Sequence, residues 1–324
     1  MIGKTGETAA QPLPKLAKKD SFWRRSGLYG YWKYKYLTLM FIPVIAFYAV
    51  FCYGPMYGII IAFKDYNFAQ GIMGSPWIGL ENFERMFHSE SFIQVFRNTL
   101  LLSLYKLITG FPAPILFALL LNELRCRRFK KTVQTISYLP YFLSWVVLGG
   151  LFIQLLSPSS GPINAILKAM GMQPIFFLGD VKWFRSVMVI TSLWKGLGWG
   201  SIIYLAGLTG IDPELYEAAT MDGAGKFKQV LHITLPSLVP VMTIMFIFAV
   251  GGVINDDFDQ IFNLYNEAVY SVGDVISTYT YRVGLISNEY GYSTAVGLFK
   301  NIIAIALLAG TNFLTKRCSD YGIW

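Results

Sequence analysis

The sequence is poor in the side chains that most enzymes and metal sites depend on. Its 324 residues include two histidines and three cysteines. His88 and His232 lie far apart in the chain, which gives no support to a metal site or to His-based hydrolysis. The cysteines show no C-x-x-C spacing, which argues against a zinc site and a disulfide framework; they are Cys52, Cys126 and Cys318.

Charge is also scarce, and this absence decides the class of protein. Only 14% of the residues are charged, 54% are hydrophobic, and the mean hydropathy is +0.47, whereas soluble domains carry about 25% charged residues. We therefore expect an all-α integral membrane protein. Since a helix needs about 20 apolar residues to cross a bilayer, we expect six transmembrane helices. They cover about 37–62, 98–121, 133–156, 186–209, 237–254 and 293–314.

The basic residues predict the orientation of these spans. Seventeen Lys and Arg residues lie in the N-terminal tail, the 122–132 segment, the 210–236 segment and the C-terminus, against seven on the opposite side. Since Lys and Arg favour the cytoplasmic side, both termini are expected in the cytosol and the 255–292 loop outside. Residues 1–36 are expected to be a cytosolic basic tail with an interfacial segment, followed by a transmembrane domain over 37–324. The net charge of +8 then indicates anionic lipid rather than nucleic acid.

Within the six spans there is no Asp or Glu, but there are three lysines: Lys106, Lys195 and Lys300. The lack of acids argues against a proton or sodium relay and therefore against a secondary transporter. One interpretation is a ring of cations at one depth in a wet cavity, facing an anionic solute. The other is that these side chains extend to the interface or bond between helices. The absence of an acid to neutralise them favours the first.

An acidic run and a glycine-rich run each suggest a catalytic site. Asp256, Asp257 and Asp259 resemble the acids that hold magnesium in a membrane-embedded diphosphate transferase; alternatively, they are a solvated cluster in the external loop. The run from Gly223 resembles a phosphate-binding loop but has Phe227 where Ser or Thr would bind magnesium. We therefore expect no nucleotide site and no bound cofactor in this chain.

The polar stretch from Asp212 to Pro240 is the most informative motif. Asp212 followed by Pro213 predicts a helix start, and Gly223 predicts its end. The order Glu217-Ala-Ala, then Asp222-Gly223-Ala224, then Ile233-x-Leu235-Pro236 resembles the cytosolic "EAA" loop of ABC-importer permeases.

This resemblance implies a type I ABC-importer permease fold with cytosolic coupling helices in the loop 210–236. It implies two separate ATPase subunits that bind ATP and magnesium, a second homologous permease subunit forming a heterodimer, and an external solute-binding protein, all in a bacterial cytoplasmic membrane. The chain itself would be a transport subunit, not an enzyme. The ATPase-coupling surface would comprise Glu217, Ala218, Ala219, Asp222, Gly223 and Ala224.

Further segments are similar to sugar permeases, and narrow the substrate. The segments 134–140, 259–266, 278–284 and 295–300 resemble the subgroup for aldouronate, pectin-fragment and alginate oligosaccharides, with alginate importers as the first candidate. The expected function is import of acidic oligosaccharides; neutral oligosaccharides are the alternative. Aromatic side chains that could stack on sugar rings are Tyr138, Tyr141, Trp145 and Trp194.

Overall fold

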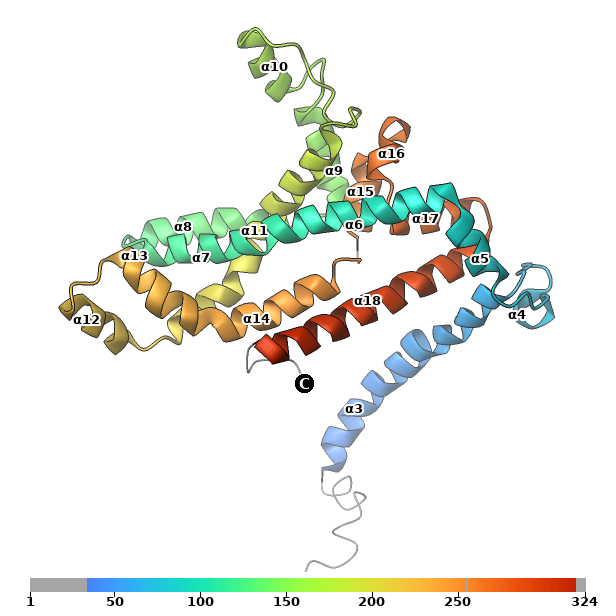
Figure 1. Ribbon diagram of the computed structural model, residues 1–324, viewed down its shortest axis with the longest axis horizontal. Coiled ribbons are helices and arrows are strands. Elements are labelled where there is room, and N and C mark those ends of the chain that lie inside the picture. Colours follow the sequence, from blue (N-terminus) through green and yellow to red (C-terminus); the bar gives the residue numbers. More distant parts are fainter. Residues whose placement is uncertain (1–33, 255, 319–324) are drawn as a thin grey trace, which may run out of the picture. The chain divides into compact units, whose positions relative to one another are not determined.

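The computed structural model describes residues 34–254 and 256–318 (Figure 1). The predicted cytosolic tail thus lies almost wholly outside the described residues. The described chain is helical, with one isolated β-bridge between Lys64 and Trp77. It divides into two compact units, 1–58 and 59–324.

The first unit contains the start of a long apolar helix. The α-helix α3 (Lys35–Phe47) continues through a π-helical stretch, η1 (Tyr48–Tyr53), into a 3-10 stretch, η2 (Gly54–Phe63). The 29 residues from Lys35 to Phe63 are long and apolar enough to cross a membrane, in agreement with the expected span 37–62. Pro43 lies inside α3, a position that membrane helices tolerate better than soluble ones.

After the end of η2, the second unit contains two short helices followed by two longer ones. These are α4 (Gly71–Gly74) and α5 (Glu81–His88), followed by α6 (Glu90–Gly110) and α7 (Pro112–Glu123). Ser89 caps α6 by accepting a hydrogen bond from the backbone N–H of Phe92, and Pro112 stands at the start of α7. Together α6 and α7 form a 34-residue candidate span.

The expected span 133–156 is not straight. The helix α8 (Arg127–Tyr138) and the 3-10 turn η3 (Leu139–Phe142) meet α9 (Trp145–Leu155) at 104°. Pro140 has no backbone N–H to donate within a helix, and the Ser144 side chain caps a new helix by accepting from the N–H of Val147. These two residues account for the bend.

The middle of the chain holds the longest regular helix before the polar stretch. After α10 (Pro162–Ala169) comes α11 (Phe184–Thr209), which has 26 residues. The polar stretch forms α12 (Pro213–Met221) and α13 (Lys226–Gln229). A π-helical stretch, η4 (Val230–Thr234), leads into α14 (Leu235–Gly251), so that Lys226–Gly251 is another candidate span.

The segment expected to be an external loop, 255–292, is largely helical where it is described. It contains α15 (Phe258–Leu264), η5 (Glu267–Val269), α16 (Tyr270–Gly273), α17 (Ile276–Tyr281) and η6 (Arg282–Ile286). The final helix, α18 (Tyr290–Cys318), follows. This segment carries buried apolar side chains, including Ile261, Val269 and Ile276, so it packs as short helices, and its external position stays a prediction.

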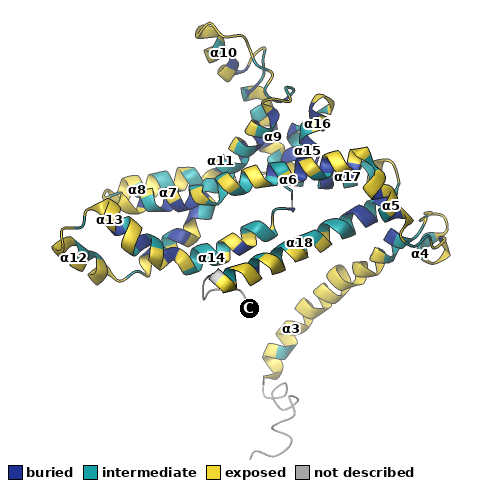
Figure 2. Ribbon diagram, viewed as in Figure 1, coloured by how far each residue is buried: buried dark blue, intermediate teal, exposed yellow. Residues whose placement is uncertain are grey.

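Three apolar clusters hold the second unit together. One joins α6, α11 and α15 around Phe184 and Ile261. A second joins α5, α6, α17 and α18 around Met86 and Val296. The third joins α7, α11 and α14 around Leu238. Away from these clusters, large apolar side chains are exposed along the long helices (Figure 2), as expected for surfaces that face lipid.

Four helices of the described chain are long and apolar enough to cross a membrane, and the bent pair of α8–η3 and α9 makes a fifth if it is one span. The expected span 186–209 corresponds to α11, which has the length but is not among those five. A total of six spans therefore stays a prediction.

Candidate functional site

The polar stretch forms a helical hairpin. Its first helix, α12, begins where the carboxylate of Asp212 accepts a hydrogen bond from the backbone N–H of Glu214, at 3.0 Å. Pro213 occupies the first helical position, where its missing N–H costs nothing. The predicted helix start at Asp212-Pro213 is thus confirmed.

Gly223 ends α12 through a Schellman motif. The N–H of Gly223 donates to the carbonyl of Thr220 (3.0 Å), and the N–H of Ala224 donates to the carbonyl of Ala219 (2.8 Å). The φ angle of Gly223 is +74°, a left-handed conformation that glycine adopts without strain. The predicted helix end is confirmed, and its geometry explains why a glycine stands there.

Two side-chain links close the hairpin. The Gln229 amide donates to the hydroxyl of Thr220 (3.0 Å) and to the carbonyl of Ala224 (3.1 Å). The hydroxyls of Tyr216 and Thr234 lie 2.9 Å apart. Sequence analysis did not identify Tyr216, Gln229 or Thr234. The i, i+4 spacing of Tyr216 and Thr220, which places both on one face of α12, was the available signal.

The coupling surface predicted from the motif is mostly open. Glu217, Ala218, Asp222 and Gly223 are exposed, and Ala219 and Ala224 are partly buried. Two apolar side chains that the motif did not mark are also strongly exposed on the same hairpin. Met221 is 88% exposed and Phe227 is 80% exposed, so this surface offers apolar contact area as well as charge.

The hairpin lies at the same end of the bundle as the basic 122–132 segment. The Lys226 ammonium is 3.6 Å from the carboxylate of Glu123, at the end of α7. The helices α12 and α13 stand at one end of α14, and α15 follows its other end (Figure 1). The two segments that sequence analysis assigned to the cytosol therefore come together.

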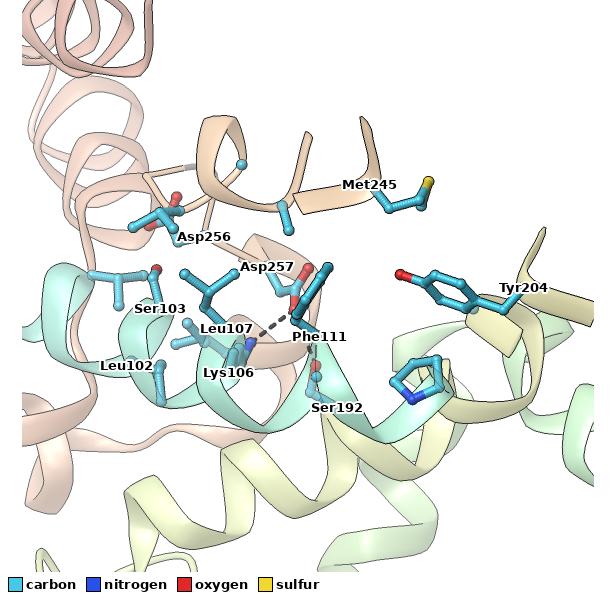
Figure 3. A pocket seen from close by; sticks show the side chains of 18 residues that line it. Leu102, Ser103, Lys106, Leu107, Phe111, Ser192, Tyr204, Met245, Asp256 and Asp257 are labelled. Atoms are coloured by element: carbon cyan, nitrogen blue, oxygen red, sulfur yellow. Dashed lines mark hydrogen bonds and ion pairs between the residues drawn. The ribbon is translucent and has the colours of Figure 1, made fainter. Parts of the chain in front are cut away.

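A cavity of about 310 Å³ lies at the other end of α14. It is formed by α6, α11, α14 and residues 256–261 (Figure 3). Its polar side chains include Lys106, Ser192, Tyr204, Asp256 and Asp257. A neighbouring cavity of about 210 Å³ shares Lys106 and Ser192 with it.

Lys106 lies between the two cavities and has a fixed position. Its ammonium donates to the carboxylate of Asp257 at 2.8 Å and to the side-chain oxygen of Gln260. Gln260 is fully buried, and its amide nitrogen donates to the carbonyl of Met188 (2.7 Å) and to the hydroxyl of Thr191 (2.8 Å) on α11. The amide orientation that α11 imposes therefore directs the oxygen of Gln260 toward Lys106.

Lys300 has a different environment. Its ammonium lies 2.6 Å from the carboxylate of Asp256 and donates to the hydroxyl of Ser277 at 2.7 Å. The same carboxylate accepts from the backbone N–H of Ser277 at 2.8 Å and from its hydroxyl. The side chain of Asp256 is 2% exposed and that of Lys300 is 15% exposed. This pair is enclosed by its partners.

Lys195 carries no ion pair within the described chain, and its ammonium lies 4.5 Å from the centroid of the Trp145 ring. Two of the other aromatic candidates stack on or meet a neighbouring ring. Tyr141 stacks on Trp199 at 4.6 Å, and Trp194 meets Phe152 edge-on at 5.7 Å. Tyr138, at the end of α8, is partly buried. Lys195 and these four aromatic residues line neither of the two cavities.

Two expectations about charge were wrong. No acid was expected to neutralise the intramembrane lysines, yet Asp257 pairs with Lys106 and Asp256 with Lys300. The acids were also expected to be solvated; Asp257 and Asp259 are exposed, yet the side chain of Asp256 is 2% exposed. Both errors have one physical reason: the chain folds back after α14, so residues that lie outside an apolar span in sequence enter the bundle in space. The three lysines consequently do not face one cavity.

The described chain matches known transport proteins. Residues 96–317 match the model of the family described as the binding-protein-dependent transport system inner membrane component. The chain belongs to this family. It therefore has the type I ABC-importer permease fold and is a transport subunit rather than an enzyme, so the transferase interpretation of the Asp256 run is wrong.

Relatives of this permease are known in Bacillus subtilis (strain 168). The polygalacturonan/rhamnogalacturonan transport system permease protein YteP is 41% identical over 99% of this chain and 100% of its own length. Protein LplB is 40% identical over 90% of this chain and 91% of its own. Among solved structures, a bacterial ABC transporter involved in import of the acidic polysaccharide alginate aligns with a TM-score of 0.84. The sequence identity is 38%, over 90% of this chain and 98% of that one.

Proposed function

We propose that this permease forms the translocation pathway for acidic oligosaccharides, such as uronate fragments of alginate or pectin. The observation that carries the proposal is Lys106, a cation held at the wall of a cavity inside the bundle. The named substrates of the relatives, polygalacturonan/rhamnogalacturonan and alginate, support the same class of substrate. A wet carboxylate–lysine pair stabilises by about 1 kcal/mol or less, which allows the solute to leave again.

The energy for transport comes from ATP hydrolysis in partner subunits. Two ATPase subunits, which bind ATP and magnesium, dock on the surface formed by Glu217, Ala218, Ala219, Asp222, Gly223 and Ala224. The exposed side chains of Met221 and Phe227 extend this surface with apolar contact area. A second, homologous permease completes a heterodimer, and an external solute-binding protein delivers the oligosaccharide. A similar transporter has been solved in complex with a periplasmic protein that holds an alginate pentasaccharide, which supports the last partner.

The permease lies in the bacterial cytoplasmic membrane with both termini in the cytosol. The basic 122–132 segment and the hairpin lie at one end of the bundle, and Lys and Arg favour the cytoplasmic side. The helices of 256–286 then lie toward the outside, where the binding protein docks.

The substrate pathway includes Lys106, with Lys195 as a further positive charge on α11, whereas Lys300 is held apart by its enclosed ion pair with Asp256. Lys195, stacked on Trp145, is the one of the three without an ion pair in the described chain, so its charge is available to attract a uronate. Tyr138, Tyr141 and Trp194 are candidates for contacts with sugar rings, since aromatic faces stack on apolar surfaces.

Uptake by the assembled importer tests this function. The permease, its partner permease, the ATPase and the binding protein are reconstituted in proteoliposomes, and ATP-driven uptake is measured for a tetragalacturonate, an alginate tetrasaccharide and a neutral arabino-tetrasaccharide. We expect uptake of at least one uronate oligomer and little of the neutral sugar. A second candidate is a neutral oligosaccharide, because an arabinooligosaccharide permease, AraP of Bacillus subtilis (strain 168), is 30% identical over 94% of this chain and 94% of its own length. Uptake of the neutral sugar alone would favour that candidate.

A further inference from the structure

We propose that Asp257 is a built-in substitute for the substrate's carboxylate: it neutralises Lys106 when the cavity is empty, and a uronate displaces it. This inference rests on the proposed function and adds a mechanism of selection to it. It follows from the contrast between the two ion pairs near the cavity, of which one is exchangeable and the other is fixed.

The Lys106–Asp257 pair has the properties of an exchangeable pair. The side chain of Asp257 is 49% exposed, and its carboxylate lines the cavity. Apart from Lys106, its one hydrogen-bond donor in the described chain is the hydroxyl of Ser192, at the long distance of 3.5 Å. Figure 3 shows the Lys106 ammonium and the Asp257 carboxylate directed toward one another at the cavity wall. Few contacts oppose the movement of this carboxylate into water.

The Lys300–Asp256 pair serves as the internal comparison. The carboxylate of Asp256 has three donors, from Lys300 and from the backbone and hydroxyl of Ser277. Its side chain is 2% exposed. A carboxylate with all its partners inside the protein does not exchange at low cost, since leaving Lys300 unpaired in a buried site is strongly destabilising. Asp256 thus anchors the backbone that carries its neighbour, Asp257.

Lys106 keeps its place when Asp257 leaves. Its second acceptor is the oxygen of Gln260, which Met188 and Thr191 hold in position. The ammonium therefore presents the same open position to any carboxylate that enters. Exchange of one carboxylate for another leaves the number of ion pairs unchanged, so a uronate gains entry at little electrostatic cost.

A neutral sugar pays a larger electrostatic cost to enter the cavity. To occupy the same volume it must separate Asp257 from Lys106 and supply no charge in return, which leaves a partly buried ammonium, 17% exposed, without an anion. Selectivity then arises from the penalty on the wrong solute as well as from attraction of the right one. Competition between the substrate's carboxylate and Asp257 also keeps the affinity for the uronate low.

The experiment compares one sugar chain in two charge states. Uptake of tetragalacturonate and of its fully methyl-esterified form is measured in the reconstituted importer for wild type, Asp257→Asn, and the control Asp259→Asn. Asp259 is exposed, lies two residues away and has no ion pair in the described chain, so its variant removes the same charge without the contact. Membrane levels of both variants are measured first.

For Asp257→Asn we expect the KM for the free acid to fall about fivefold, the factor that ~1 kcal/mol corresponds to, with a lower kcat because release is slower. We expect the KM for the methyl ester to fall by a similar factor, because the ester no longer has to separate Asp257 from Lys106, and we expect Asp259→Asn to match wild type. An unchanged KM for the acid, or the same fall in Asp259→Asn, overturns the exchange mechanism while leaving the function intact. If the wild-type importer takes up no uronate oligomer, the proposed function itself fails and the exchange mechanism fails with it.

The double variant Lys106→Met/Asp257→Asn gives a second measurement. It should take up acid and ester at similar rates, and a retained preference for the acid contradicts the proposal.

Discussion

The hydroxyl of Tyr216 lies 2.9 Å from the hydroxyl of Thr234, which joins α12 to the helix that continues as α14. Thr234 is 3% exposed, so the contact is shielded from water. With the bonds of Gln229 to Thr220 and Ala224, it holds the hairpin as one body with α14. If the ATPase docks on α12 as proposed, this contact joins the docking surface to α14, whose other end borders the cavity.

Removing that hydroxyl should weaken the transmission of force without removing the docking surface. For Tyr216→Phe we expect the number of substrate molecules transported per ATP hydrolysed to fall by up to about fivefold, because a hydrogen bond of this kind contributes ~1 kcal/mol. Uptake and ATP hydrolysis are measured together in proteoliposomes. The control is Ser237→Ala, whose hydroxyl, within the described residues, bonds only to the carbonyl of Ile233 one turn earlier. An unchanged ratio in Tyr216→Phe would show that this contact does not carry the coupling.

Charge reversal on the coupling surface should separate assembly from folding. Glu217 is exposed, so Glu217→Lys should leave the permease in the membrane at its normal level while abolishing co-purification of the ATPase and ATP-driven uptake. Glu214→Lys, the same change on the same helix but outside the motif, is the control, with a cost of about 0.3–1 kcal/mol from the helix dipole. Wild-type uptake by Glu217→Lys would refute the assigned docking surface.

The hairpin could be predicted from sequence because its determinants are local. A carboxylate before Pro213 caps a helix, and Gly223 supplies a left-handed residue that few other residues adopt without strain,; both signals lie within one turn of the place where they act. The same holds for the apolar spans, whose length alone indicates their environment.

The charged cavity could not be predicted because its contacts join distant parts of the chain. Lys106 and Asp257 are separated by 151 residues, and whether they meet depends on how the chain returns into the bundle after α14. Counting acids inside apolar spans misses a carboxylate that enters from the adjoining segment. The bend between Phe142 and Trp145 was missed because the span 133–156 was defined by its apolar residues, without regard to Pro140 or to the helix cap that Ser144 provides.

The enclosed ion pair makes a prediction about stability. Lys300→Met leaves the carboxylate of Asp256 buried without its cation, which costs about 3–5 kcal/mol in such sites, so we expect a large loss of folded permease in the membrane. Adding Asp256→Asn removes the unpaired charge and should restore much of that level. Folded protein is quantified by size-exclusion chromatography in detergent. A Lys300→Met variant that is fully stable but selectively defective with uronates would instead place Lys300 in the substrate pathway.

The close crossing of α11 over α8 should require a glycine at position 198. A Cβ added at Gly198 would lie 2.2 Å from the carbonyl oxygen of Ser137, and a backbone oxygen in a helix cannot move aside as a side chain can. We expect Gly198→Ala to destabilise the permease by about 1–3 kcal/mol and to lower its melting temperature in detergent. In Gly196→Ala on the same helix, the added Cβ meets no described atom beyond its own helix backbone within 4 Å, and the variant gains the helix propensity of alanine, ~1 kcal/mol. If both variants melt at the same temperature, the two helices do not cross as closely as the structure has them.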